Sequence, residues 1–114
     1  MKFRSWNEEL KRFVYFENGK YFIQEYEECK VKENLNNLFN WQNTEQYTGK
    51  KDNNGIEIYV GDNLMTNNPR GIEDLTYLVE WDNWSNSYII TSGNIEHQLM
   101  DIEDNCIIVG NKHQ

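Results

Sequence analysis

The stretch QYTGKKDNNGIEIYVGD, Gln46 to Asp62, decides how the second half of this chain folds. DNNG, residues 52–55, is a strong turn signal, because Asn, Asp and Gly tolerate the backbone angles of tight turns. In IEIYV, residues 56–60, isoleucine and valine alternate with Glu57 and Tyr59, which predicts a half-buried β-strand. A Gly-Asp pair then ends that strand. We interpret the stretch as a turn, a strand and a second turn, and not as an active site.

Several residues of this stretch form a structural signature in our interpretation: Tyr47, Gly49, Asp52, Gly55, Tyr59, Gly61 and Asp62. The three glycines recur at every sixth position, but their spacing matches neither of the glycine patterns that cradle phosphate groups. We therefore expect glycines that permit turns, and no nucleotide site.

The first part of the chain predicts a β-hairpin. KRFVYF (11–16) and KYFIQEY (20–26) are rich in aromatic and β-branched residues, and Asn18-Gly19 between them is a tight-turn signal. Residues 27–39 then change character, and their apolar positions predict one face of a short helix. Those positions are Val31, Leu35, Leu38 and Phe39.

Strand patterns return after Pro69 and Gly71, which exclude a central strand in the loop that contains them. In LTYLVEWD (75–82), alternation places Leu75, Tyr77, Val79 and Trp81 on one face. NSYIITS (86–92) places Tyr88 and Ile90 on one face and Ile89 on the other, and CIIVG (106–110) is a last strand. Residues 95–105 fit a short helix or an edge strand equally well. Short strands at this spacing predict a small barrel.

Length and composition indicate one domain, residues 1–114, with a hairpin and helix part (1–45) and a barrel part (46–114). The start of the chain is charged and no long apolar run follows, so we expect a soluble protein of the cytoplasm. Cys29 and Cys106 are far apart and form no CxxC pair, which argues against disulfides and thiolate metal sites. Seventeen asparagines and no alanine are typical of an AT-rich genome, such as that of a low-GC bacterium or its virus.

The negative charge is concentrated in the second half of the chain. Residues 1–57 hold 9 basic and 10 acidic side chains, whereas residues 58–114 hold 2 and 9, so the halves carry −1 and −7 of the net −8. A phosphate-binding surface is not expected on the second half, because affinity for nucleic acid depends on Lys and Arg. Its acidity indicates either a solvated face or a surface that binds a basic partner. In the second case the acidic surface would mimic nucleic acid.

Few residues combine into a pattern that carries chemistry. Glu80 and Asp82 lie two apart on a predicted strand and share a face, so a divalent-ion site is conceivable, but a solvent-facing pair is the better interpretation. His97 and His113 lack metal-ligand spacing, and neither cysteine lies in a nucleophile motif. We expect no catalytic residue, no metal and no cofactor.

The aromatic residues exceed what a small core requires. We expect Trp6, Trp81 and Tyr59 to pack in the core. Trp84 and Tyr88 instead flank a polar segment with the composition of a hairpin tip, and exposed aromatic side chains are common anchors of interfaces. The predicted partner-binding surface consists of Trp84, Tyr88, Glu80 and Asp82.

Four blocks of sequence resemble the YopX family of bacteriophage and prophage proteins. They are KFRSW (2–6), the stretch 46–62, VEWD (79–82) and IIVGN (107–111), and they occur in the family's order over nearly the whole chain. The resemblance implies a mostly-β fold with an SH3-like part in the C-terminal half, and plausible assembly into homo-oligomers. It carries over no catalytic residue, because the family has no established biochemical activity.

The leading hypothesis is a phage or prophage accessory protein that is not an enzyme and acts by binding another protein, such as a host factor or a component of bacterial defence. The alternative is a small-barrel module that binds nucleic acid or mimics DNA, and a metal-dependent enzyme ranks third. Binding to nucleic acid would rest on basic residues of the first half, namely Lys2, Arg4, Lys11, Arg12, Lys50 and Lys51. We expect no membrane partner, and a homo-oligomer is a further expectation.

Overall fold

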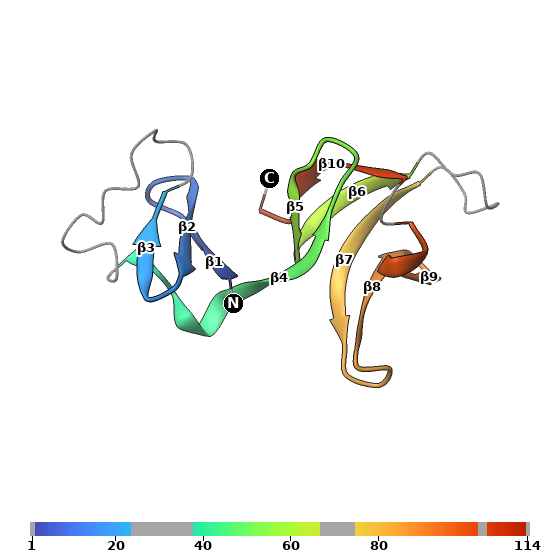
Figure 1. Cartoon of the computed structure of the whole chain (residues 1–114), viewed down its shortest axis with the longest axis horizontal. Coiled ribbons are helices and arrows are strands. Elements are labelled where there is room, and N and C mark those ends of the chain that lie inside the picture. Colours follow the sequence, from blue (N-terminus) through green and yellow to red (C-terminus); the bar gives the residue numbers. More distant parts are fainter. Residues whose placement is uncertain (1, 24–37, 67–74, 103–104, 114) are drawn as a thin grey trace. The chain divides into compact units, whose positions relative to one another are not determined.

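The structure, a computed structural model, describes residues 2–23, 38–66, 75–102 and 105–113 (Figure 1). These residues are mainly β, as the sequence predicts. The strands are β1 (Lys2–Asn7), β2 (Arg12–Glu17), β3 (Lys20–Phe22), β4 (Thr44–Lys51), β5 (Glu57–Tyr59), β6 (Asp62–Thr66), β7 (Thr76–Asp82), β8 (Ser87–Ser92), β9 (Ile95–Gln98) and β10 (Cys106–Asn111). Two short 3-10 helices, η1 (Trp41–Asn43) and η2 (Leu99–Asp101), complete the described elements.

The chain forms two compact units, Met1–Tyr47 and Thr48–Gln114. Strand β4 crosses the boundary, with residues 44–47 in the first unit and 48–51 in the second. In hydrogen-bonded order the strands run β3-β2-β1-β4-β5 and β10-β6-β7-β8-β9, and the pairings are antiparallel. No helix among the described residues is long and apolar enough to span a membrane.

The predicted N-terminal hairpin is present as β2 and β3. Asn18 and Gly19 both have positive φ angles, 52° and 77°, as a tight turn between twisted strands requires. Across β1 and β2 the aromatic rings meet in register, with Trp6 opposite Phe13 at a ring distance of 5.0 Å. Such contacts contribute to the stability of a unit that has few fully buried residues.

The predicted helix falls mostly outside the described residues, because Val31 and Leu35 lie in the undescribed range 24–37. Of its apolar positions, Phe39 is buried and packs edge-on against Trp41 and Tyr21, at ring distances of 4.7 and 5.6 Å. Phe39 therefore contributes to the core of the first unit.

Asp52 organises the turn between β4 and β5. One oxygen of its buried carboxylate accepts hydrogen bonds from the backbone N–H groups of Asn54 and Ile56, both at 2.9 Å. The other oxygen accepts a bond of 3.0 Å from the N–H of Ile108, in β10. Gly55 has a φ of 76°, which an L side chain rarely adopts. The turn predicted from residues 52–55 is present, and the same carboxylate joins it to the last strand.

The strand after this turn is shorter than the alternation predicts. Strand β5 spans only Glu57–Tyr59, and Ile56 before it is half exposed. Ile58 and Tyr59 are adjacent, yet both are buried. Alternation predicted a longer strand, but Ile56 belongs to the turn, where its N–H donates to Asp52, and it is therefore not covered as Ile58 and Tyr59 are.

The core of the second unit lies on one side of the sheet β10-β6-β7-β8-β9. It consists of buried residues from β5 to β10 and η2: Ile58, Leu64, Tyr77, Val79, Ile90, Leu99, Ile102 and Cys106. Removal of each large aliphatic side chain from water stabilises the fold by roughly 1.5–3 kcal/mol. The described strands form no closed barrel, because their order has two ends, at β9 and β10.

Trp81 does not pack in the core as the sequence analysis expected. It follows Tyr77 and Val79 on the same side of β7, but its side chain is 44% exposed, while theirs are fully buried. Trp81 lies near the end of β7, beyond the last core residues, so nothing comparable covers it. Alternation predicts the side on which a residue lies, and not whether that side is covered.

The sequence left residues 95–105 open between a short helix and an edge strand, and the structure has a short element of each kind there. Ile95–Gln98 pairs with β8 as the edge strand β9, and Leu99–Asp101 forms a single 3-10 turn. Leu99 and Ile102 are buried, which explains why apolar residues recur there at helical spacing. Residues 103–104 lie outside the described part.

Replacement of Asp52 tests its role in the turn. We expect Asp52→Ala to lower the free energy of unfolding by about 3 kcal/mol, because three backbone N–H groups lose a charged acceptor. Urea denaturation followed by tryptophan fluorescence measures the change. Asp101→Ala, at an exposed position, is the matched control and should change stability by less than about 0.5 kcal/mol. Equal stabilities of the two variants would contradict the role assigned to Asp52.

Candidate functional site

The tip of the β7–β8 hairpin is held in shape by Asp82. Its carboxylate accepts hydrogen bonds from the N–H of Trp84 at 3.3 Å, and from the N–H and Oγ of Ser85 at 3.1 and 2.7 Å. Asn86 adopts a positive φ of 51°, which asparagine tolerates better than most residues. The loop is therefore an ordered turn, and Figure 1 shows this hairpin extending away from the other strands of its unit.

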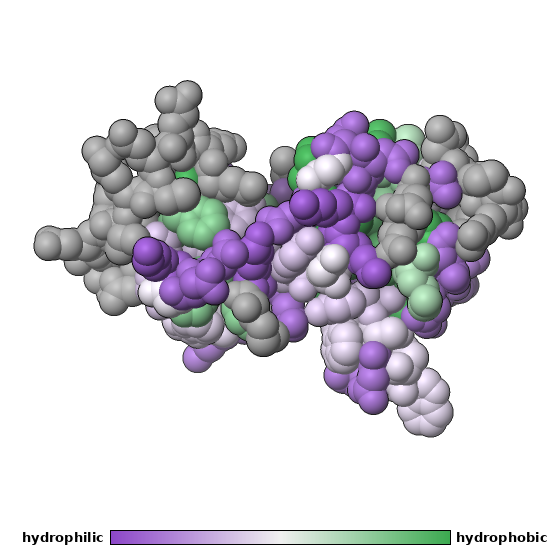
Figure 2. Space-filling view, in the orientation of Figure 1, coloured by the Kyte–Doolittle hydropathy of each residue, from purple (hydrophilic) through white to green (hydrophobic). Residues whose placement is uncertain are grey.

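Trp84 is the most exposed large side chain of the described residues, with 94% of its surface accessible. Figure 2 shows the hairpin tip at the lower right as pale side chains of intermediate hydropathy beside a few purple, hydrophilic ones. The indole of Trp84 is presented to solvent by a turn that is already ordered. An ordered aromatic side chain loses little conformational entropy on binding.

A second aromatic pair lies just behind the tip. Trp81 and Tyr88 are directly opposite on β7 and β8, and their rings meet edge to face at 4.9 Å. The Trp81 indole N–H donates to Oδ1 of Asn83 at 2.8 Å. Partial burial raises the pKa of the Tyr88 hydroxyl above its usual value of 10.0. Trp81, Trp84 and Tyr88 thus belong to one hairpin end, and sequence reasoning had assigned Trp81 elsewhere.

Glu80 and Asp82, predicted to share a face, bond to different neighbours in the same hairpin. Oε2 of Glu80 accepts from the hydroxyl of Thr91 at 3.2 Å, whereas Asp82 accepts from the turn residues. Between residues 75 and 102 the sequence contains no Lys or Arg, but it contains Glu80, Asp82, Glu96 and Asp101. The exposed aromatic tip therefore belongs to an acidic part of the chain.

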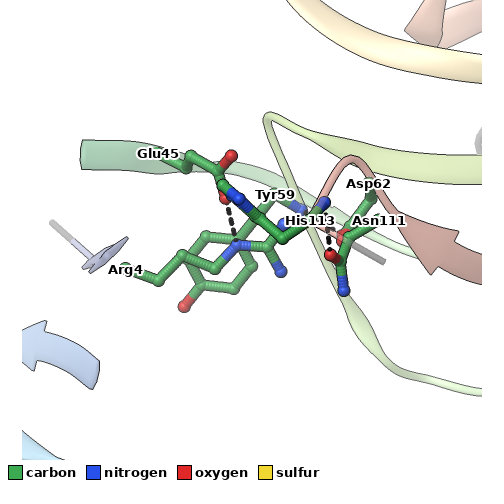
Figure 3. Close-up of polar contacts among 6 residues, drawn as sticks. All are labelled: Arg4, Glu45, Tyr59, Asp62, Asn111 and His113. Atoms are coloured by element: carbon green, nitrogen blue, oxygen red, sulfur yellow. Dashed lines mark hydrogen bonds and ion pairs between the residues drawn. The ribbon is translucent and has the colours of Figure 1, made fainter. Parts of the chain in front are cut away.

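The signature residues lie within β4, in the two turns, and at the ends of β5 and β6 that face each other along the chain. Oδ2 of Asp62 accepts from the N–H of Tyr59 at 2.8 Å, which ties the start of β6 to the end of β5 (Figure 3). The Thr48 hydroxyl donates to the carbonyl of Ile58 at 2.7 Å, across the same region. The Lys2 ammonium lies over the ring of Tyr47, 5.4 Å from the ring centre. The contacts of these residues are therefore with their own chain.

A buried ion pair lies in the first unit. Nε of Arg4 donates to Oε1 of Glu45 at 2.8 Å, and their side chains are only 5% and 3% exposed (Figure 3). The Arg4 guanidinium also lies over the Phe13 ring, 4.0 Å from its centre. β1 and β4 carry the two charged residues opposite each other in register. Sequence reasoning assigned Arg4 to a surface and missed this pair.

Basic residues considered for nucleic-acid binding take part in contacts within the first unit. Lys2 forms an ion pair with Glu17 at 3.7 Å, and Lys11 forms one with Glu8 at 2.6 Å. With Arg4 buried against Glu45, at least three of the six candidates have an acidic partner on the same chain. Their charge is thus partly neutralised, which weakens attraction to phosphates.

The histidines and cysteines are dispersed. The ring of His97 meets that of Tyr77 edge-on at 6.0 Å, and the N–H of His113 donates to Oδ1 of Asn111 at 2.9 Å (Figure 3). Cys106 is buried in the core, and Cys29 lies outside the described residues. Within the described ranges, no three His, Cys, Asp or Glu residues are grouped in a way that would hold a metal ion.

Comparison with known proteins identifies the family. The model of the YopX protein family matches residues 2–114. The chain belongs to the YopX family. This confirms the resemblance based on four sequence blocks, and it associates this YopX family member with bacteriophages and prophages. A search of curated proteins found no match.

Sequence reasoning also missed an apolar surface on β6 and β10. Met65, Ile107 and Val109 are 42%, 37% and 47% exposed, although they are interior-type residues. The sequence contained a signal for this surface. Residues 65–66 (MT) and 106–110 (CIIVG) include no charged residue, which is unusual for strands with one side facing solvent. The sequence analysis assigned CIIVG to a last strand and did not say which of its side chains are buried.

Acidification tests the carboxylate that orders the tip. Hydrogen bonds from Ser85 hold the pKa of Asp82 below its usual 3.8, so the ionised form favours the ordered turn. That contribution is present above about pH 4 and is lost as the pH falls through the lowered pKa. We expect the Ser85 amide resonance to shift with acid in NMR spectra. In the Asp82→Asn variant the Ser85 amide resonance should no longer shift with acid. If the shift persists, a group other than Asp82 causes it.

Two ion pairs of the first unit, Arg4–Glu45 and Lys11–Glu8, provide a comparison of buried with exposed. We expect Glu45→Ala to cost about 3 kcal/mol of unfolding free energy, because Arg4 loses a buried acceptor. Glu8→Ala, which removes an exposed pair with Lys11, should cost less than about 1 kcal/mol. Thermal and urea unfolding of both variants measures the difference. Similar losses would show that burial of the Arg4 pair has no energetic consequence.

Proposed function

We propose that this YopX family member is a phage or prophage accessory protein that has no catalytic activity and acts by binding another protein. The observation that carries the proposal is the 94% exposure of Trp84 on a turn ordered by Asp82. Tryptophan is among the residues most enriched in binding hot spots, and an indole held in water by an ordered turn can bury a large apolar area against a partner.

The surroundings of Trp84 support a partner with a basic surface. Residues 75–102 carry acidic side chains and no Lys or Arg, and the second half of the chain carries −7. Complementary charge accelerates encounter and rejects acidic partners. The partner surface proposed is a positively charged rim around an apolar pocket that admits the Trp84 indole, with Tyr88 and Glu80 beside it. A host factor or a component of bacterial defence is the class of partner that suits a phage protein.

Mimicry of DNA is the closest alternative, because a basic pocket that binds nucleic acid would also attract this acidic surface. Competition distinguishes the two forms of the proposal. If the captured partner also binds DNA, duplex DNA should displace the YopX family member in the mimicry case only.

We also propose that residues 46–114 have an SH3-like arrangement and that residues 27–39 contain a short helix. Short antiparallel strands that pair with their neighbours, β6 with β7 and β7 with β8, support the former. An experimental structure in which β9 and β10 belong to separate domains would exclude the SH3-like arrangement.

Substitution of Trp84 tests the binding hypothesis. We expect Trp84→Ala to weaken binding to the captured partner by roughly 30-fold or more, the loss typical of a hot-spot residue. Affinity capture from an infected or lysogenic low-GC host provides the partner, and titration calorimetry measures the affinity. Trp41→Ala is the control, since Trp41 is 52% exposed but lies in the first unit. Equal binding by Trp84→Ala and the unmodified chain would refute the assignment of the site.

Binding to nucleic acid requires a separate measurement. Gel-shift titration at low salt should show no complex with single-stranded or duplex DNA if the protein-binding proposal holds. A complex that weakens steeply with salt would instead support the nucleic-acid module.

A further inference from the structure

The rings of Trp81 and Tyr88 form two walls that stand on one face of the β7–β8 hairpin. The two residues are directly opposite in register, so their side chains leave the sheet on the same side. The ring planes meet at 70°, with the ring centres 4.9 Å apart. Trp81 is 44% exposed, so its indole is open to a ligand. We name Trp81 and Tyr88 the aromatic corner.

The aromatic corner is held in place by the rest of its unit. Tyr88 packs against the buried core cluster, which restrains one wall. The other wall is restrained by the bond of 2.8 Å from the Trp81 indole N–H to Oδ1 of Asn83. That N–H is the only hydrogen-bond donor of an indole, so the exposed part of Trp81 offers a ligand its aromatic ring and no polar group. Rings that are already fixed lose little conformational entropy on binding.

Aromatic rings attract cations, and rings of the first unit already hold cations of the chain. The Arg4 guanidinium lies 4.0 Å from the centre of the Phe13 ring, and the Lys2 ammonium lies 5.4 Å from that of Tyr47. The attraction comes from the negative face of the ring, and tryptophan provides the strongest such face. The segment that carries the aromatic corner supplies no cation to it, because residues 75–102 contain neither Lys nor Arg.

The charges beside the aromatic corner also favour a cation. Glu80 and Asp82 flank Trp81 along β7, and alternation places their side chains on the other face of the strand. Their carboxylates bond to Thr91 and Ser85, so they add negative potential without filling the corner. An anionic ligand is repelled by this potential, and an uncharged ligand gains nothing from it. The corner therefore suits a positively charged group.

We propose that the aromatic corner binds an arginine side chain of the partner protein. This inference rests on the proposed function, because it names the cationic group that the partner presents beside Trp84. A guanidinium is planar and weakly hydrated, so it stacks on aromatic rings more readily than the compact, strongly hydrated ammonium of lysine. Its remaining N–H groups can still bond to other acceptors. Arginine, tryptophan and tyrosine are also the residues most enriched in binding hot spots.

Trp84 and the aromatic corner have different roles in this complex. Trp84, with 94% of its surface exposed, enters a pocket of the partner, whereas the corner receives a side chain from the partner. Trp81 is thus a binding residue, and its exposure beyond the last core residues of β7 serves that contact. The two contacts can be removed separately, because Trp84 lies in the turn and Trp81 lies in the strand.

A titration of the full chain with a small probe tests the corner without the partner. We expect N-acetyl-arginine amide to shift the indole N–H resonance of Trp81 in NMR spectra, because the guanidinium lies over the ring. N-acetyl-citrulline amide has nearly the same shape but no charge, and it should cause little shift. The indole of Trp41, 52% exposed in the first unit, is the internal control. Equal shifts from the two probes, or equal shifts at Trp41 and Trp81, would overturn the proposal.

Variants of the corner test the contact in the complex with the captured partner. Trp81→Leu keeps an apolar side chain but removes the ring, so the affinity measured by titration calorimetry should fall roughly fivefold or more. Trp81→Phe retains a smaller ring and should recover part of that loss. Trp41→Leu is the matched control, because it makes the same change at an exposed tryptophan of the first unit, and its affinity should stay within about twofold of the unmodified chain.

The outcomes separate this inference from the proposed function. If Trp84→Ala loses binding while Trp81→Leu binds as the unmodified chain does, the arginine contact is refuted and the protein-binding function stands. If Trp81→Leu loses binding while Trp84→Ala does not, the corner is supported and the role of Trp84 is refuted. Equal losses for Trp81→Leu and Trp81→Phe would also overturn the inference, because the ring would then contribute nothing.

Discussion

The buried carboxylate of Asp52 is the constraint on which the second unit depends. It accepts two hydrogen bonds from its own turn and a third from Ile108, 56 positions later in the chain. A carboxylate is well suited to this task, because its two oxygens accept several bonds and its charge strengthens each of them. The local turn and the long-range attachment of the last strand are therefore formed by one side chain, and loss of either would leave buried N–H groups without that acceptor.

Attachment of the turn to β10 affects how the molecule can meet a partner. A sheet that ends in a strand with unpaired backbone groups is prone to pair with other chains. Here Asn53 and Asp52 bond to backbone groups on β10, which are therefore not open to another strand, while Met65 and Ile107 stay exposed beside them. This arrangement permits a contact between side-chain surfaces while it protects the edge of the sheet against aggregation.

Acidic and neutral surfaces divide the second unit into two regions. The β7–β8 hairpin combines Trp84 with acidic residues, and its turn is ordered by Asp82 before any partner binds. The strands β6 and β10 present aliphatic side chains with no exposed charge. The acidic hairpin would attract a protein of opposite charge, as the proposed function requires, whereas β6 and β10 offer no such attraction.

The sequence by itself determined the β class, the family, the turns at Asn18-Gly19 and at residues 52–55, and the placement of Trp84 at a hairpin tip. Each of these depends on local backbone preference or on a run of neighbouring residues, which a single chain displays directly. Only the tertiary structure decided that Asp52 reaches Ile108, that Arg4 is buried against Glu45, and that Trp81, Met65 and Ile107 are exposed. Those outcomes depend on which strands become neighbours and on what covers each side of a sheet. Alternation of residue types assigns a side chain to one face, but only the packing of distant segments determines whether that face meets water.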